Sequence, residues 1–124
     1  MKRFYLALSI LALTLLNSCN TSPNCQLEGR WVLASYSNTM WIFTDSLQYT
    51  LYDLDSTGFG GIDEALPGPH TWSMDGDTLV VDLNFGNELR ALPVFDCNCN
   101  VLDLMGSTST ITLHTEGYDI QDCQ

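Results

Sequence analysis

The sequence predicts an all-β domain, and three observations support this prediction. Apolar residues recur with a period of two far more often than at helical spacing. Turn-forming pairs and triplets rich in Gly, Asn and Asp separate the short apolar segments. About one hundred residues remain after the N-terminal segment, which is enough for one domain with one core. Short antiparallel strands with tight turns are expected to close into a small up-and-down barrel of about eight strands, with a β-sandwich as the alternative.

The alternation of apolar and polar residues places the expected strands. They cover residues 29–37, 40–44, 46–53, 70–74, 77–84, 88–96, 100–105 and 108–115. Asp75-Gly76 is the strongest hairpin signal and is expected at the centre of a type I′ turn. Pro93 predicts an edge, a bulge or a bend in its strand. Residues 55–69 are rich in Gly, Pro and Asp, and are expected to form a long loop.

The N-terminal segment has the order of an export signal. Lys2 and Arg3 precede an apolar run that is shorter than the roughly 18 to 20 residues needed to cross a bilayer as a helix. Leu16-Asn17-Ser18-Cys19 resembles the lipobox of bacterial lipoproteins. The resemblance implies a signal peptide over 1–18, a lipidated Cys19 with a polar tether over 19–28, and a domain over 29–124. An ordinary secretory signal cleaved nearby is the alternative.

Lipidation would determine where the protein acts. One acyl chain binds a membrane only reversibly, so two or three chains on Cys19 would be needed to hold the protein there. The expected location is the bacterial cell envelope, with the outer membrane as the expected membrane and its face left open. The membrane is then the first expected partner, through the N-terminal lipid.

The charge balance excludes one class of partner. The chain has 15 acidic residues against 4 Lys and Arg, and its formal net charge is -11. Such a surface repels phosphate groups, so nucleic-acid binding is not expected. A solvated exterior that keeps the protein soluble explains this acidity without a dedicated cation site.

Four short motifs resemble the lipocalin-like domains of small bacterial lipoproteins. They are Gly29-Arg30-Trp31, Trp41-Ile42-Phe43, the hairpin from Trp72 to Leu83, and Ile111-Thr112-Leu113. The resemblance covers most of the chain after the tether. It implies a barrel in which Trp31 packs at the closed base.

In a closed barrel, the large apolar residues of alternating positions should face inward. The expected inner face consists of Trp31, Leu33, Trp41, Phe43, Tyr49, Leu51, Trp72, Leu79, Val81, Ile111 and Leu113. Five aromatic residues of this face are the candidates for lining a ligand pocket: Trp31, Trp41, Phe43, Tyr49 and Trp72. The same side chains can instead fill the interior, and both alternatives stay open.

Four cysteines remain when Cys19 is set aside, and in an exported domain they suggest two disulfides. On an extended strand the β-carbons of Cys97 and Cys99 would be some 6 to 7 Å apart, too far for a bond between them. Both are therefore expected to pair outward with Cys25 and Cys123, in either combination. A zinc site with four thiolate ligands is the alternative.

One acidic loop partly matches a calcium-binding loop. Asp53, Asp55 and Glu64 occupy the first, third and twelfth positions, Thr57 the fifth, and Gly58 the sixth, where a sharp turn is needed. The alternative is a plain acidic loop, because such spacing arises easily by chance in an acidic protein. No other cofactor is expected.

The sequence contains no motif of an enzyme. It lacks G-x-S-x-G, H-E-x-x-H and a phosphate-binding glycine loop. We therefore expect a non-catalytic, lipid-anchored module that binds a small apolar ligand. The alternative is a structural or interaction lipoprotein, with an envelope protein as partner, a filled barrel and a calcium-binding acidic loop.

Overall fold

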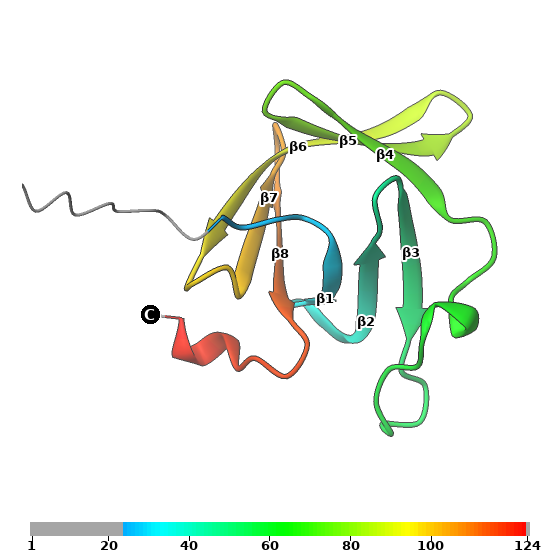
Figure 1. Cartoon of the computed structure of the whole chain (residues 1–124), viewed down its shortest axis with the longest axis vertical. Coiled ribbons are helices and arrows are strands. Elements are labelled where there is room, and N and C mark those ends of the chain that lie inside the picture. The colour runs from blue at the N-terminus through cyan, green and yellow to red at the C-terminus, as the bar shows by residue number, and fades with distance from the viewer. Residues whose placement is uncertain (1–23, 124) are drawn as a thin grey trace, which may run out of the picture.

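The chain forms a closed barrel of eight antiparallel strands, in which each strand pairs with the next and the last pairs with the first (Figure 1). The computed structural model describes residues 24–123. The expected signal peptide, the lipidation site Cys19 and the first residues of the tether lie outside this range. The expected up-and-down barrel is confirmed.

The strand boundaries follow the predicted alternation closely from the third strand onward. The strands are β1 Gly29–Leu33, β2 Tyr36–Phe43, β3 Leu47–Tyr52, β4 His70–Asp75, β5 Thr78–Asn84, β6 Asn87–Asp96, β7 Val101–Met105 and β8 Thr110–Thr115. Two short 3-10 helices, η1 Ile62–Glu64 and η2 Ile120–Asp122, lie in the β3–β4 loop and near the C-terminus.

The strand β6 belongs to two sheets. Its first half pairs with β5 and its second half, from Leu92 onward, pairs with β7. The strands β4 and β5 and the first half of β6 form a three-stranded antiparallel sheet. This sheet lies across one side of the barrel, at the top of Figure 1. Pro93 follows the point where β6 stops pairing with β5, which agrees with the bend expected there.

Two turns differ from the prediction. The expected first strand over 29–37 is wrong, because the chain turns at Ala34-Ser35 and Tyr36 already begins β2. The β4–β5 turn has Gly76-Asp77 at its centre, since Asp75 pairs with Thr78. Gly76 has a φ of 60°. Asp77 is not among the described residues with positive φ. A type I′ turn needs positive φ at both central positions, so the turn is of type II′ and not of the expected type I′.

The interior of the barrel is filled with apolar side chains from nearly every strand. The buried members are Leu27, Trp31, Phe43, Leu79, Val81, Ala91, Leu102, Leu104 and Leu113. Partly buried residues that pack against them are Leu33, Trp41, Trp72, Leu89, Phe95 and Ile111. Burial of this apolar surface is the main stabilising contribution to the barrel.

A second apolar cluster lies on the outer face of β1, β2 and β3. Its buried members are Val32, Met40, Ile42 and Leu51, with Tyr49, Phe59 and Ala65 packed against them. Met40 pairs with Leu51 and Ile42 with Tyr49, so these side chains share one face of the sheet. The β3–β4 loop covers this face through Phe59 and Ala65.

The outer cluster corrects the predicted inner face. Tyr49 and Leu51 were expected inside, but they point outward, and the inner positions of β3 are Gln48, Thr50 and Tyr52. Alternation separates two faces of a strand without showing which one faces the interior. The covering loop makes the apolar face of β3 the outer one.

Arg30 also attaches the covering loop to the barrel. Its Nε donates to Glu116 Oε2 at 2.7 Å, and its Nη2 donates to the Gly60 carbonyl oxygen at 2.9 Å. These contacts join β1, the loop and the segment after β8. The contact of Arg30 with Gly60 therefore adds to the packing of the neighbouring Phe59 in holding the loop.

Replacing Phe59 with serine is expected to loosen this loop without opening the barrel. Burying a phenylalanine side chain contributes roughly 1.5 to 3 kcal/mol, and Phe59 is only partly buried. The amide of Leu66, which donates to the Thr50 carbonyl oxygen at 2.9 Å, should then exchange its hydrogen about tenfold faster. The matched control is Leu54→Ser, since Leu54 is 88% exposed. Equal exchange in both variants would contradict the packing role of Phe59.

The two ends of the barrel differ. At one end, two disulfides join the β6–β7 turn to the N-terminal and C-terminal segments. Leu27 and Trp31 belong to the same buried cluster there. The indole nitrogen of Trp31 donates to the Leu27 carbonyl oxygen at 2.8 Å. This end is closed by packed side chains. The other end is bounded by the β1–β2 turn, the end of β3 and the start of β8.

Candidate functional site

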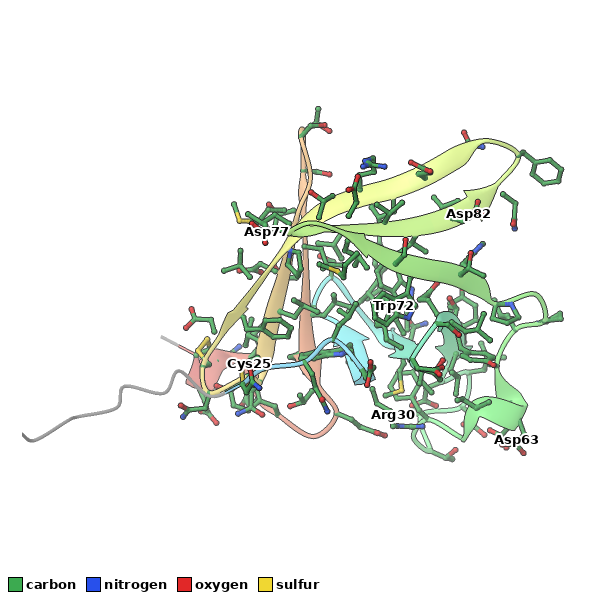
Figure 2. All side chains as sticks on the ribbon, turned by 45° about the horizontal axis from the view of Figure 1, so that its top comes forward. Cys25, Arg30, Asp63, Trp72, Asp77 and Asp82 are labelled. Carbon is green, nitrogen blue, oxygen red and sulfur yellow. A yellow bond between two sulfur atoms is a disulfide. The ribbon has the colours of Figure 1, made fainter. Side chains whose placement is uncertain are left out.

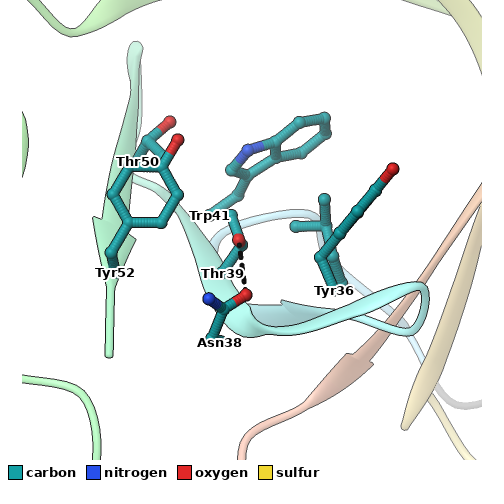
Figure 3. A pocket seen from close by; sticks show the side chains of 7 residues that line it. Tyr36, Asn38, Thr39, Trp41, Thr50 and Tyr52 are labelled. Atoms are coloured by element: carbon teal, nitrogen blue, oxygen red, sulfur yellow. Dashed lines mark hydrogen bonds between the residues drawn. The ribbon is translucent and has the colours of Figure 1, made fainter. Parts of the chain in front are cut away.

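A cavity opens at the end of the barrel opposite Trp31. Its volume is about 510 Å³, and its lining consists of Leu33, Tyr36, Asn38, Thr39, Trp41, Thr50 and Tyr52. Figure 3 shows Tyr36 and Tyr52 on opposite sides of the opening, with the indole of Trp41 between them. Small-molecule sites have volumes of roughly 300 to 1,000 Å³, so this cavity has the size of a ligand site.

A smaller cavity adjoins the first. Its volume is about 190 Å³, and residues of β8, among them Ile111, line its far side. Leu33, Tyr36 and Trp41 line both cavities. The side chains of Tyr36 and Trp41 therefore separate the larger cavity, which is more polar, from the smaller cavity, which is more apolar.

An edge-to-face series of rings holds Trp41 in place. The centroids of Trp41 and Phe43 are 6.4 Å apart, with an angle of 80° between the ring planes. Phe43 packs in the same manner on Trp72, at 6.0 Å and 83°. The indole nitrogen of Trp72 donates to the Thr44 carbonyl oxygen at 3.0 Å, and Figure 2 shows Trp72 between the β4–β5 hairpin and the strands beneath. The rigid core thus fixes the orientation of the cavity wall.

Of the five aromatic residues predicted to line a pocket, the structure places Trp41 in the cavity wall. Trp31 and Phe43 are 3% and 2% exposed and belong to the filled interior, and Trp31 also borders a surface hollow of about 370 Å³ at the closed end. Trp72 packs against that interior, and Tyr49 lies in the outer cluster. Most of the predicted lining therefore serves as core.

Sequence reasoning missed the two tyrosines of the cavity. The predicted first strand over 29–37 includes Tyr36, and the predicted inner face includes Tyr49 and Leu51, which leaves Tyr52 on the opposite face of its strand. Both are exposed aromatic side chains at strand ends, where a barrel opens. The alternation of Gln48, Thr50 and Tyr52 would have identified this wall if the inner face of β3 had been known.

The polar groups of the cavity are uncharged. Thr39 Oγ1 donates to Asn38 Oδ1 at 3.3 Å, and Thr50 Oγ1 accepts from Gln48 Nε2 at 3.3 Å. No lining residue is an acid, a histidine, a lysine or an arginine. These side chains can orient a ligand by hydrogen bonds.

Both arginines of the described chain are engaged outside the cavity. Arg30 is bound to Glu116 and Gly60, and Arg90 donates to Glu88 at 3.0 Å and to Asp75 at 2.9 Å. The carboxylates of Glu88 and Asp75 raise the pKa of Arg90.

The four cysteines form two disulfides at the closed end, Cys25–Cys99 and Cys97–Cys123. The outward pairing is therefore confirmed, and the zinc alternative is wrong because disulfide sulfurs are not thiolate ligands. The expected reason was incomplete, since Cys97, Asn98 and Cys99 are not extended but have φ angles of 51°, 56° and 68°. This left-handed turn directs two neighbouring cysteines to different segments. Cys25 is labelled in Figure 2.

The β3–β4 loop holds the predicted calcium ligands in a hydrogen-bonded turn. Asp55 Oδ1 accepts from the hydroxyl of Thr57 at 2.6 Å and from its amide at 3.2 Å. Asp53 Oδ2 accepts from the Gly58 amide at 3.2 Å. Glu64 lies in η1.

The predicted ligands are not gathered around one point. Among the described His, Cys, Asp and Glu residues, the group whose ligand atoms come close together is Asp96, Cys97 and Cys123, of which both cysteines are disulfide-bonded. Asp53, Asp55 and Glu64 form no such group. Binding calcium there would require a rearrangement of the loop.

Replacing Thr57 with valine is expected to raise the pKa of Asp55 toward its ordinary value of 3.8, because the side-chain hydrogen bond from Thr57 is the largest cause of the lowered pKa. A lowered pKa in the folded state stabilises the fold above pH 3.8, and this contribution is lost as the pH falls through the lowered value. A carboxyl carbon NMR titration measures the change. Thr71→Val, in β4, is the control and should leave Asp55 unchanged. An unaltered pKa in Thr57→Val would contradict this assignment.

Comparison with models of protein families, with curated proteins and with solved structures finds no significant match for this chain. Within residues 24–123, no helix has the length and apolar character needed to cross a membrane.

Proposed function

We propose that the protein is a non-catalytic module of the bacterial cell envelope, anchored by a lipid on Cys19, that binds a small ligand at the open end of its barrel. The observation that carries this proposal is the contrast between the two ends. At one end the interior is filled around Trp31, and the surface hollow there, of about 370 Å³, has Trp31 as its one aromatic lining residue. The other end holds a cavity of about 510 Å³ with three aromatic residues in its wall. A ligand would enter the mouth of the barrel and not its centre.

The position of the N-terminal segment supports the proposed orientation. Cys25 lies at the closed end, where it is bonded to Cys99. A lipid on Cys19 would be attached six residues before it. The closed end would then face the membrane, and the cavity at the far end of β1 would face the aqueous phase.

The lining supports a binding role over catalysis. It combines three aromatic rings and Leu33 with the amide of Asn38 and the hydroxyls of two threonines. Ligand sites typically combine apolar walls with a few polar groups that fix orientation. The proposed ligand has an apolar part for the rings and a polar part for the rim.

An interaction module for an envelope protein is the second candidate. Phe85 favours it, since this side chain is fully exposed at the tip of the β5–β6 hairpin. Its φ of 55° is unusual for a bulky residue. An exposed ring on a projecting turn is a feature that a protein partner could cover.

The proposed function is tested with N-phenyl-1-naphthylamine, a neutral apolar dye that fluoresces on leaving water. The full-length chain is expressed in a bacterium and extracted in detergent, and the assay uses a detergent concentration too low for the dye to partition into micelles. The protein should bind the dye with a saturable signal. Trp41→Leu should weaken binding about tenfold, since a ring of this kind contributes on the order of 1 to 2 kcal/mol. Phe85→Leu is the control for a ring outside the cavity and should bind as the parent does. Saturable binding that is indifferent to Trp41 would refute the assigned site.

A further inference from the structure

The three rings of the cavity come from separate positions and share one opening. Tyr36 begins β2, Trp41 lies within it, and Tyr52 ends β3. In Figure 3 the two tyrosines stand on either side and the indole closes the space between them. The arrangement is an aromatic cage that is open on one side.

The faces of the two tyrosine rings are available to a ligand. Tyr36 is 65% exposed and Tyr52 is 47% exposed. The ring contacts found in the described chain join Trp31 to Phe95, Trp41 to Phe43 and Phe43 to Trp72, so neither tyrosine is stacked on another ring. An aromatic face carries partial negative charge and attracts a cation placed over it.

The surrounding charge also favours a cation. The cavity lining has no basic residue, and both arginines of the described segment are paired with carboxylates elsewhere. The chain carries a formal net charge of -11. A cationic ligand is therefore attracted by the field of the whole molecule and meets no repelling group at the site.

The absence of a carboxylate from the lining distinguishes between kinds of cation. A primary ammonium is compact and strongly hydrated, and it needs several hydrogen-bond acceptors to leave water. A quaternary ammonium has no N–H group and is recognised by aromatic faces alone. The uncharged rim with its three rings matches the second kind.

We propose that the ligand of this cavity carries a quaternary ammonium group, held by Tyr36, Trp41 and Tyr52. This inference rests on the proposed function and specifies its ligand class. The cavity has room for the trimethylammonium head and for the remainder of a larger molecule. The group can belong to a free compound such as choline or to a phosphatidylcholine headgroup, and the two sources are separated by experiment.

The experiment compares choline with 3,3-dimethylbutan-1-ol, its uncharged isostere, and with ethanolamine, its primary amine. The full-length protein in a detergent without a quaternary ammonium group is titrated with each compound and binding is followed by NMR. Choline should bind about fivefold more tightly than either relative, because a cation over exposed rings is worth roughly 0.5 to 1 kcal/mol. Vesicles of phosphatidylcholine and of phosphatidylglycerol then test the headgroup as the source.

Variants assign the effect to the rings. Tyr36→Leu and Tyr52→Leu should each weaken choline binding about fivefold, while Tyr36→Phe and Tyr52→Phe should retain it, because the ring and not the hydroxyl attracts the cation. Both tyrosines are exposed, so these variants should fold. Phe85→Leu is the control.

Equal binding of choline and its uncharged isostere would overturn the quaternary ammonium assignment and leave the proposed binding function standing. No choline binding would overturn the assignment as well. The dye experiment uses none of these compounds. Absence of saturable dye binding would therefore refute the proposed function, whatever the result with choline.

Discussion

Replacing Cys25 and Cys99 with serine is expected to lower the free energy of unfolding by about 4 kcal/mol. The bond joins residues 74 positions apart, and the cost of closing a loop in the unfolded chain grows with its length. A loss of this size should lower the melting temperature by roughly 15 to 30 °C for a domain of this length. Chemical denaturation followed by circular dichroism measures the loss.

The second disulfide provides the comparison. Cys97–Cys123 spans 26 positions, and its removal should cost about 1 kcal/mol less than removal of the first bond. Both variants lose two cysteines from the same end of the barrel. The chain-entropy explanation would be contradicted if the variant without the shorter bond were the less stable one.

Replacing Leu79 with alanine is expected to destabilise the barrel by about 2 to 5 kcal/mol. Leu79 is fully buried in the interior cluster, and removing three carbons from a packed core adds a cavity to the lost apolar burial. Urea denaturation gives the change in the free energy of unfolding.

Leu92→Ala on β6 is the matched control, because Leu92 is 45% exposed. It should change stability by no more than about 0.5 kcal/mol. A cost below about 1 kcal/mol for Leu79→Ala would mean that the interior is not tightly packed, and a ligand could then occupy the centre of the barrel.

The number of strands could be predicted from the sequence, because alternation and turn residues act locally. Closure into the expected barrel instead of the alternative β-sandwich depends on the pairing of β1 with β8, which joins the two ends of the domain. The boundary between β1 and β2 could not, since Val32 to Tyr36 keeps a regular alternation through the turn at Ala34-Ser35. The pairing of Asp75 with Thr78 likewise depends on the register of two strands and not on the turn sequence alone.

The candidate site was predicted only in part because its location depends on which face of β3 is inside. The loop residues Phe59 and Ala65 cover the face of Tyr49 and Leu51, which turns Thr50 and Tyr52 toward the cavity. This contact joins residues that no local pattern connects. The aromatic residues of the core were recognised, but the chain before folding does not show which of them would remain accessible.

The most direct test of the central claim uses the indole N–H signals of the three tryptophans, assigned by replacing each with phenylalanine. The full-length protein is labelled with ¹⁵N and titrated with N-phenyl-1-naphthylamine. We expect the signal of Trp41 to shift, while that of Trp31, which is bonded to Leu27 at the closed end, stays in place. A shift of Trp31 without a shift of Trp41 would contradict a binding site at the open end of the barrel.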